Sequence, residues 1–318
     1  MFEKMISVII PTYNGGELLR KSLLTWSQQT MSDSDFEVIV VDNNSQEDIR
    51  SIVNDVCAEV HRATWNVRYI FEPKAGATNA RHAGARASKG EILVFADNDG
   101  LYGGGNLISI REAFKQMPEV GAVACKIDLS WDTTPPKWIE QYAYMLGQLD
   151  YGNEIRHGKL YFNSGLFAIK RSVFEQVHGF NPDLIGGKMI GDGDTGLVMK
   201  LWNAGIPIGW TPFATMQHMQ QVAKHGSVDG VALHFYNVGV ANSYALFRKN
   251  DFFYTKSVRK HRMISWLLSV KYWFLYNILR HRNRTTYFSM RQHQGERDFY
   301  RNLRNPDVRQ EVMKKDLY

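Results

Sequence analysis

The chain has 318 residues, of which 44% are hydrophobic and 22% are charged. This composition excludes a disordered or fibrous chain, and the length allows one large globular domain or two modest ones. The two cysteines, Cys57 and Cys125, are expected to be buried free thiols, which favours a reducing, cytoplasmic compartment. The apolar run at residues 5–10 ends at Pro11 and is too short for a signal peptide.

The basic charge is concentrated in the C-terminal part of the chain. Residues 248–318 contain 17 Lys and Arg against 6 Asp and Glu, a net charge of +11, whereas the whole chain carries +6. The remaining residues are therefore net acidic. Such a distribution indicates an anionic partner for the C-terminal part, and we expect a membrane surface rather than nucleic acid.

The first half of the chain alternates predicted strands and helices. Short buried runs rich in branched side chains predict strands at residues 7–10, 36–41, 67–71 and 92–96. Apolar spacing predicts helices around residues 19–26, at 46–62 and at 78–88, the last followed by Gly90 as a stop signal. This alternation predicts an α/β fold with a mostly parallel sheet flanked by helices.

Each of these four strands runs into polar or turn-forming residues. They are Thr12-Tyr13-Asn14, Asp42-Asn43-Asn44, Glu72-Pro73 and Asp97-Asn98-Asp99. The carboxyl ends of parallel strands meet at one edge of a sheet, where ligands bind in open α/β folds. We therefore expect one ligand site built from these strand ends.

Asp97 and Asp99 form an Asp-x-Asp pair at the end of the fourth strand. In an extended segment residues two apart point to the same side, so the two carboxylates could hold one divalent cation. Mg²⁺ and Mn²⁺ prefer such oxygen ligands. The alternative is a polar turn that ends the strand.

The second half of the chain is less regular. Strands are predicted at residues 120–127, 161–169 and 206–210. Residues 128–159 are expected to form a long loop with a short helix, and residues 186–194 a Gly-rich loop before a helix at 195–204.

Five segments together resemble glycosyltransferase family 2. They are Val-Ile-Ile-Pro-Thr-Tyr-Asn at residues 8–14, Val-Val-Asp-Asn-Asn-Ser at 40–45, Gly-Ala-Thr-Asn-Ala-Arg-His-Ala-Gly at 76–84, Phe-Ala-Asp-Asn-Asp at 95–99 and Asp-Gly-Asp-Thr-Gly-Leu at 192–197. The resemblance covers about residues 5–220 and implies a nucleotide-sugar-binding and catalytic domain of the GT-A type at residues 1–220. A helical, basic extension at residues 221–318 follows it. Two departures from the family pattern are Gly193, where a Glu is frequent, and His82, where an Asn is frequent.

The resemblance implies inverting transfer of a sugar from a nucleotide diphosphate sugar, most often a UDP-sugar, with Mn²⁺ or Mg²⁺ as cofactor. The acceptor would be a hydroxyl of a glycan or of a lipid-linked molecule. Residues placed at the donor are Pro11, Thr12, Tyr13, Asn14, Asp42, Asn44, Glu72, Gly76, Arg81, Asp97 and Asn98. Residues placed at the metal are Asp97, Asp99 and His218.

Some of these residues have structural alternatives. Asp42 could be a turn residue that ends its strand, and Arg81 could belong to a solvated helix face. His218 could be a structural histidine. Trp131, Trp138 and Tyr142, in the long loop, could stack on acceptor sugars or belong to the core.

Inverting transfer requires one general base, and no general acid is needed if a metal holds the departing diphosphate. Asp194 is the predicted base and Asp192 the alternative, both at the start of a predicted helix. Either could instead be a helix N-cap. The helix N-terminus would keep the carboxylate ionised, and the neighbouring glycines would leave room for a sugar.

Residues 263–279 are almost entirely apolar and have basic residues on both sides. The run is shorter than the ~20 residues of a membrane span, and the even charge distribution argues against crossing. We predict a helix lying on the inner face of an anionic membrane, with packing on the catalytic domain or in a homodimer as alternatives.

Two other functions compete with sugar transfer. A nucleotidyltransferase should carry a Gly-rich, basic phosphate loop after its first strand, but here Gly15-Gly16 is followed by Glu17. A non-catalytic nucleotide-sugar or membrane-binding module would not need the acids at positions 97, 99 and 194.

Overall fold

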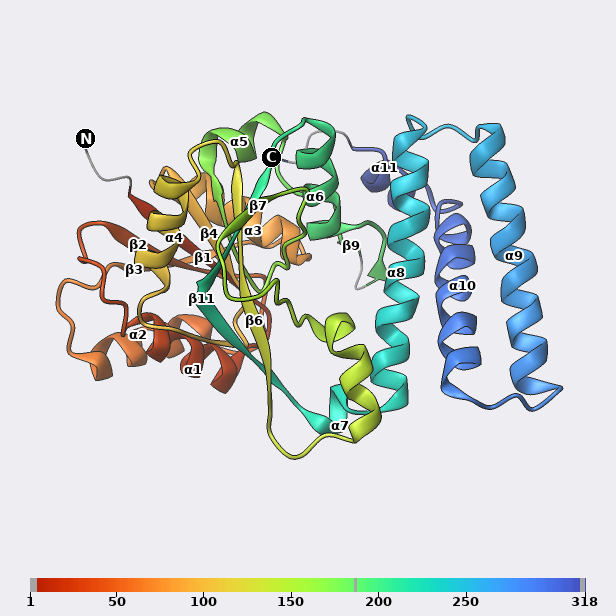
Figure 1. Cartoon of the computed structure of the whole chain (residues 1–318), viewed down its shortest axis with the longest axis horizontal. Helices are drawn as coiled ribbons and strands as arrows, with labels where there is room; N and C mark the ends of the chain where they lie inside the picture. The colour runs from red at the N-terminus through yellow and green to blue at the C-terminus, as the bar shows by residue number, and fades with distance from the viewer. Residues whose placement is uncertain (1–4, 186–187, 315–317) are drawn as a thin grey trace.

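The computed structural model describes residues 5–185, 188–314 and 318. Within these ranges a nine-stranded sheet has helices on both faces, and the long helices α8, α9 and α10 stand beside it (Figure 1). The strands are β1 (Ile6–Thr12), β2 (Phe36–Asp42), β3 (Val67–Phe71), β4 (Ile92–Ala96), β5 (Gly100–Tyr102), β6 (Ala122–Trp131), β7 (Arg156–Gly158), β8 (Leu166–Lys170), β9 (Leu184–Ile185), β10 (Lys188–Met189) and β11 (Ile208–Gln220). The helices are α1 (Gly16–Trp26), α2 (Ile49–Val60), α3 (Ala77–Ala87), α4 (Asn106–Gln116), the 3₁₀ helix η1 (Lys137–Leu146), α5 (Arg171–Gln176), α6 (Gly193–Asn203), α7 (Val222–His225), α8 (Val228–Lys249), α9 (Lys256–Asn277), α10 (Arg284–Asn302) and α11 (Pro306–Val312).

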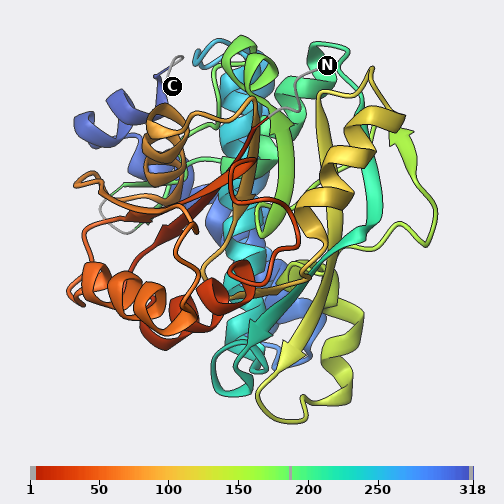
Figure 2. The same cartoon turned by 90° about the vertical axis from the view of Figure 1, so that its left-hand side faces the viewer.

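The strands of the sheet follow the order β3-β2-β1-β4-β8-β6-β11-β5, with β7 paired to β11. The first four are parallel, β8 is antiparallel to both of its neighbours, and β6 and β11 form a long parallel ladder. Most paired residues lie in parallel ladders, which confirms the predicted α/β fold. Figure 2 shows β6 and β11 running together beyond the rest of the sheet.

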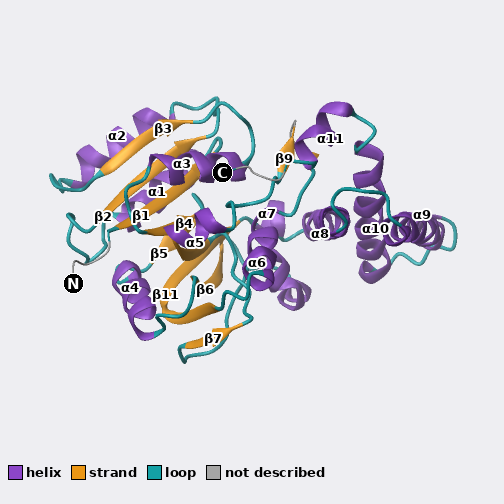
Figure 3. Cartoon of the chain, turned by 90° about the horizontal axis from the view of Figure 1, so that it is seen from above, coloured by secondary structure: helices purple, strands orange, loops and turns teal. Residues whose placement is uncertain are grey.

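Alternation along the strands divides the core between the two faces of the sheet. In β1, Val8 and Ile10 point to one face and Ile9 to the other, and all three are fully buried. Helices α1, α2 and α4 cover the first face, and α3, α5 and α6 cover the second (Figure 3). Burial on both faces explains why these strands are continuous apolar runs.

Several predicted boundaries differ from the structure. The strand expected at residues 161–169 begins only at Leu166, and the strand expected at 206–210 is β11, which continues to Gln220. Pro212 does not end this strand, because it lies in an irregularity between Thr211 and Thr215, where a proline needs no ladder partner. Helix α4 was not predicted, whereas α8 lies in the extension at residues 221–318 that was predicted to be helical.

The two cysteines agree with the prediction of free thiols. Cys125 is buried in β6, Cys57 is half-buried in α2, and they are not bonded to each other. The Gly-rich loop predicted at residues 186–194 lies partly outside the described residues, since positions 186 and 187 are not included.

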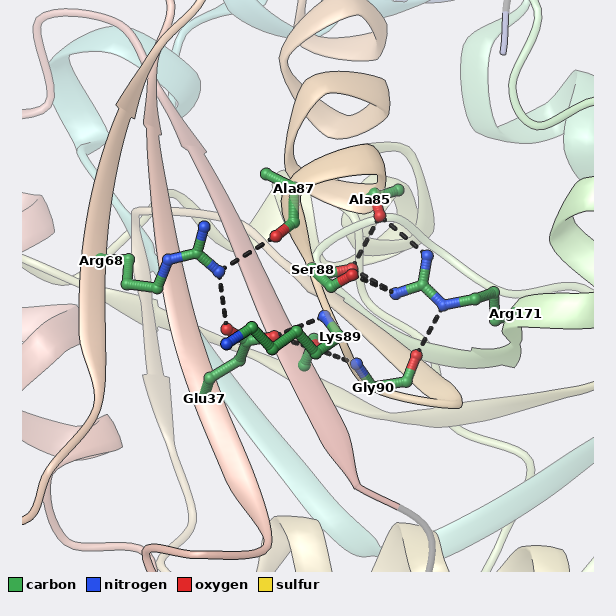
Figure 4. A network of polar contacts seen from close by, with 9 residues as sticks. Glu37, Arg68, Ala85, Ala87, Ser88, Lys89, Gly90 and Arg171 are labelled. Atoms are coloured by element: carbon green, nitrogen blue, oxygen red, sulfur yellow. Dashed lines mark hydrogen bonds and ion pairs between the residues drawn. The ribbon is translucent and has the colours of Figure 1, made fainter.

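The C-terminal end of α3 is tied to the sheet by polar contacts (Figure 4). The buried carboxylate of Glu37 accepts hydrogen bonds from Ser7 Oγ at 2.8 Å and Arg68 Nη1 at 2.9 Å. From the other side, the guanidinium of Arg171 donates to the carbonyl oxygens of Ala85 at 2.9 Å, Ser88 at 3.0 Å and Gly90 at 2.7 Å. Arg171 thereby ties the end of α3 and the residues just after it to the start of α5.

Arg171→Ala is expected to lower the free energy of unfolding by about 1–3 kcal/mol, because the carbonyls at the end of α3 lose their donor. Urea unfolding followed by circular dichroism measures the change. Arg86→Ala is the matched control: Arg86 is exposed on the same helix, and its loss should cost less than about 0.5 kcal/mol. Equal stabilities of the two variants would contradict the bracing role of Arg171.

The chain after β11 forms helices that pack side by side. Helix α10 packs between α8 and α9. Helices α8 and α10 approach each other closely at Gly239 and Gly295. A Cβ added to Gly239 would lie 2.0 Å from the carbonyl oxygen of Gln292. The predicted boundary at residue 220 coincides with the end of β11, while the division into two domains stays a prediction. In the described part of the chain, every helix is too short or too polar to cross a membrane.

Candidate active site

The four polar strand ends meet at one edge of the sheet, as predicted. Asn98 Nδ2, after β4, donates to Thr12 Oγ1 at the end of β1 at 3.0 Å. Asn43 Nδ2, after β2, donates to the carbonyl oxygen of Glu72, after β3, at 3.0 Å. The Asn14 backbone N–H, in the turn after β1, donates to Ser45 Oγ at 2.9 Å. The first four strands therefore present one continuous polar surface.

This surface forms a cavity of about 800 Å³, which we call the strand-end cavity. It is lined by Pro11, Thr12, Tyr13, Asn43, Asn44, Ser45, Gln46, Ala75, Gly76, Ala77, Arg81, Asp97, Asn98, Asp99 and Leu184. Most of the predicted donor residues are therefore in its wall. The exceptions are Asn14, Asp42 and Glu72, which are not among its lining residues.

Asp42 is buried and its carboxylate is already occupied. Its Oδ2 accepts from the hydroxyl of Tyr69 at 2.9 Å, and its Oδ1 accepts from the Ser45 backbone N–H at 2.9 Å. Glu72 accepts from the backbone N–H of Lys74 at 2.8 Å. Both acids thus stabilise the turns beside the cavity. For Asp42 this agrees with the alternative that it is a turn residue at the end of its strand.

Glycines allow the close approach of backbone at the cavity. Gly76 enters α3 with a φ of 127°, a conformation that other residues rarely adopt. A Cβ at Gly15 would lie 2.2 Å from Thr12 Oγ1 and 2.3 Å from Asn98 Nδ2. A side chain at either position would disturb the cavity wall.

Arg81 is buried at the inner end of the strand-end cavity, so it does not belong to a solvated helix face. Its Nη2 donates to Asp97 Oδ1 at 2.7 Å, and its guanidinium lies over the ring of Phe180 at 5.5 Å. Burial and the neighbouring Asp99 raise the pKa of Asp97 against the opposing charge of Arg81. The neighbour of Arg81, His82, is structural: its Nε2 accepts from the Phe180 N–H at 2.9 Å.

Asp99 faces His218 across two strands. His218 lies in β11, whose register places it opposite Gly100 in β5, and its Nε2 is 3.4 Å from Asp99 Oδ2. Burial lowers the pKa of His218, but the hydrogen bond and charge of Asp99 outweigh it, and the net shift is upward. The other carboxylate oxygen, Asp99 Oδ1, is buried and has no hydrogen-bond partner.

This unpartnered oxygen fits a cation bound at Asp99. Among residues 5–185, 188–314 and 318, no group of three or more His, Cys, Asp or Glu could hold a metal by itself. Mg²⁺ and Mn²⁺ frequently take one or two carboxylates and complete their shell with substrate phosphates and water. The residues present are therefore compatible with a metal that arrives with a diphosphate.

A second cavity of about 410 Å³ contains Asp192 and Asp194, the two candidates for the base. Asp194 is half-buried, and its Oδ2 accepts from the Ser164 backbone N–H at 3.1 Å. Asp192 is 4% exposed, and its Oδ1 accepts from Asn181 Nδ2 at 2.8 Å. Burial raises the pKa of Asp192 to about 7.

Consecutive residues connect the second cavity to the strand-end cavity. Ser164 holds Asp194, and the carbonyl oxygen of the next residue, Gly165, accepts from the Asp97 backbone N–H at 3.1 Å. The charge of Asp194 also reaches the buried guanidinium of Arg81 and helps to raise its pKa, against the effect of burial. The segment just before β8 therefore bonds to one acid from each cavity and fixes their relative positions.

The second cavity contains residues that sequence reasoning missed. They are Tyr144, Met145, Gln148, Leu149, Tyr161, Asn163, Met189, Thr195, His234, Asn237, Val238 and Ala241. The last four come from α8, so the C-terminal part contributes to the site. No motif marks α8 in the sequence, and only its packing against η1 reveals this role.

The aromatic residues singled out in the long loop belong to a core cluster. Tyr142 packs edge-on against Phe288 at 5.1 Å, and Trp138 lies under the guanidinium of Arg284 at 4.7 Å. Trp131 packs against the same cluster. Tyr144 is instead the exposed aromatic residue at the second cavity.

Comparison with known proteins identifies the fold. A mannosyltransferase from Pyrobaculum calidifontis, solved with GDP-Man and Mn²⁺, aligns over 93% of this chain and 88% of its own, with a TM-score of 0.54 and 19% identity. TarS residues 1–349 of S. aureus, solved with UDP-GlcNAc, aligns over 93% of this chain and 92% of its own, with a TM-score of 0.52 and 14% identity. The fold is therefore that of GT-A glycosyltransferases.

The sequence comparisons agree. The family model "Glycosyl transferase family 2" matches residues 7–178, which is more than half of the chain. Validoxylamine A glucosyltransferase of Streptomyces hygroscopicus subsp. limoneus is 35% identical over 101 residues, which are 31% of this chain and 21% of that protein. An uncharacterized glycosyltransferase of Haemophilus influenzae is 32% identical over 57% of this chain and 58% of its own length. The chain spans well under two thirds of these relatives.

The chain belongs to glycosyltransferase family 2. This membership favours sugar transfer over the nucleotidyltransferase and the non-catalytic module that the sequence left open.

Proposed function

We propose that the protein is a metal-dependent, inverting glycosyltransferase that uses a UDP-sugar. It moves the sugar to a hydroxyl of a glycan or a lipid-linked acceptor. The observation that supports this most is the arrangement of the acids. Asp97 and Asp99 line the strand-end cavity, and Asp194 lines the second cavity. The adjacent residues Ser164 and Gly165 bond to Asp194 and to Asp97, respectively.

In this proposal the strand-end cavity binds the nucleotide. Tyr13 is 61% exposed at its mouth and offers a flat surface for the base. Asn44, Gly76 and Asn98 line the wall with polar groups and backbone. Arg81 presents its buried guanidinium toward the phosphates, since a planar, paired cation suits phosphate recognition.

Asp99 and Asp97 hold the divalent cation, with His218 beside them. When bound, the cation neutralises charge on the departing diphosphate. The buried, unpartnered Oδ1 of Asp99 supports this role, because a buried carboxylate oxygen without a partner is costly. His218 orients Asp99 through its ring nitrogen, 3.4 Å away.

Asp194 takes the proton of the acceptor hydroxyl in the second cavity. Its carboxylate accepts hydrogen bonds from the backbone N–H groups of Ser164 and Thr195, which fix its position. Asp192 lies deeper beneath the helix start and is already bonded to Asn181. This arrangement supports Asp194 as the base, with Asp192 in a structural role beside it.

UDP is expected to raise the melting temperature strongly with Mn²⁺ and much less with EDTA. A ligand that binds only the folded state at about 100 times its Kd stabilises it by about 2.7 kcal/mol. Differential scanning fluorimetry with UDP, GDP and dTDP measures this effect and ranks the nucleotides. The same shift with and without metal would refute the metal in the donor site. Hydrolysis of UDP-, GDP- and dTDP-sugars then identifies the donor.

A further inference from the structure

Helix α9 exposes its large apolar side chains and buries small ones. Its buried residues are Val258, Ser265 and Ser269. Its exposed apolar residues, each 38–56% accessible, are Met263, Ile264, Trp266, Leu267, Val270, Trp273 and Phe274. A helix on the surface of a protein surrounded by water shows the reverse pattern, with its apolar side chains facing the core, because burial of apolar surface stabilises the fold.

The exposed side chains form one stripe along the helix. Positions 263, 266, 267, 270, 273 and 274 recur at spacings of three and four, which places them on one face. Helix α9 is the outermost of the three packed helices and lies farthest from the sheet (Figures 1 and 3). The apolar stripe of α9 therefore faces outward.

A basic groove lies beside this stripe. The groove between α9 and α10 has a volume of about 710 Å³ and is lined by Arg259, Arg262, Met263, Trp266, Arg297, Tyr300, Arg301 and Arg304. No acid is among these residues. Arg297 is bonded to Asp298 at 3.1 Å, whereas the other four arginines form no ion pair within the described chain.

We propose that the apolar stripe and the arginine groove dock the protein on an anionic phospholipid membrane. The stripe enters the boundary between headgroups and acyl chains, with Trp266 and Trp273 at that level. The arginines bind lipid phosphates, for which planar guanidinium groups are suited. The proposal depends on no step of the sugar transfer.

The charge of this region favours a membrane over a second copy of the chain. Residues 256–295 contain nine Lys and Arg and no Asp or Glu. Two copies joined through this face would bring two basic surfaces together without acids to pair them, which is costly. An anionic membrane supplies the missing charge.

Docking through α9 has a consequence for the second cavity. Helix α8 lines that cavity and packs on α10, which in turn holds α9. With helix axes about 10 Å apart, the axis of α8, which lines the cavity, lies about 20 Å from the axis of the docked helix. The site is thereby held near the membrane surface.

The test is sedimentation of the full chain with vesicles. The wild-type protein should bind vesicles of mixed phosphatidylcholine and phosphatidylglycerol and be left in solution by phosphatidylcholine alone. Arg262→Glu with Arg301→Glu should weaken binding at least about tenfold, since each basic residue near the surface contributes about 1 kcal/mol. Trp266→Ser with Trp273→Ser should weaken binding by a similar factor.

Lys21→Glu with Arg86→Glu is the control, because both residues are exposed on the catalytic part and the net charge changes equally. Equal loss of binding in this control would overturn the proposal, as would failure of the wild-type protein to bind anionic vesicles. Tryptophan quenching by brominated anionic lipid tests the stripe without any variant, and an absence of quenching would also overturn it. If the tryptophan variant turns a dimer into a monomer and still binds vesicles, the stripe is an interface between copies.

Discussion

Asp194→Asn should lower kcat by about 10²–10⁴-fold and leave the affinity for UDP unchanged, because the variant loses the general base but keeps the strand-end cavity. Asparagine retains the size of the side chain and an oxygen that can accept from the Ser164 N–H. Steady-state transfer assays and the UDP-induced melting shift measure the two quantities. If UDP binding is lost as well, Asp194 belongs to the donor site and is not a dedicated base.

Asp192→Asn is the matched control for this prediction. Since burial raises the pKa of Asp192 to about 7, the folded protein holds this proton more tightly than the unfolded chain. The native protein should therefore lose stability as the pH rises from about 4 to about 7, and Asp192→Asn should remove that loss. Its kcat should stay within about tenfold of wild type. A collapse of kcat in this variant alone would make Asp192 the base.

The second large effect is expected at the metal. Asp99→Asn should lower kcat/KM by at least about 10²-fold and abolish the extra stabilisation that Mn²⁺ gives to bound UDP. The substitution removes the negative charge that would face the cation. It changes the same carboxylate whose buried Oδ1 has no hydrogen-bond partner in the protein. Transfer assays across Mn²⁺ concentrations and calorimetry of Mn²⁺ binding with UDP measure the effect.

Asp55→Asn serves as the control, because Asp55 is an exposed carboxylate on α2 outside both cavities. This variant should match the wild type in activity and in its response to Mn²⁺. An Asp99→Asn enzyme with the metal dependence of wild type would place the cation elsewhere. Asp97→Asn should cause a comparable loss and also release Arg81, its 2.7 Å partner, which should raise KM for the donor.

Much of the catalytic part could be predicted from local patterns. Strands β1, β2 and β4 are buried on both faces and therefore appear in the sequence as short apolar runs, while β3 is only partly buried. Their polar ends meet because parallel strands share a direction, which is a consequence of topology and not of any single contact. The same shared direction of parallel strands predicts that Asp97 and Asp99 lie at this edge of the sheet.

Such local patterns could not predict the contacts between distant segments. Asp42 reads as a strand-end acid, and only the fold shows its carboxylate bonded to Tyr69 and Ser45. His218 lies beyond the strand predicted at residues 206–210, but it belongs to β11, because an irregularity near Pro212 lets the strand continue. The register of β11 against β5 then places His218 opposite Gly100, where its Nε2 lies 3.4 Å from Asp99 Oδ2.

The sequence by itself determined the α/β architecture, the family and the acids at one sheet edge, because hydrophobic periodicity and strand-end residues are local properties of the chain. The tertiary structure decided that α8 lines the second cavity, that Trp138 and Tyr142 pack in a core, and that α9 turns its serines inward. Each of these depends on which faces of distant helices meet, and that choice is made by packing among all elements together.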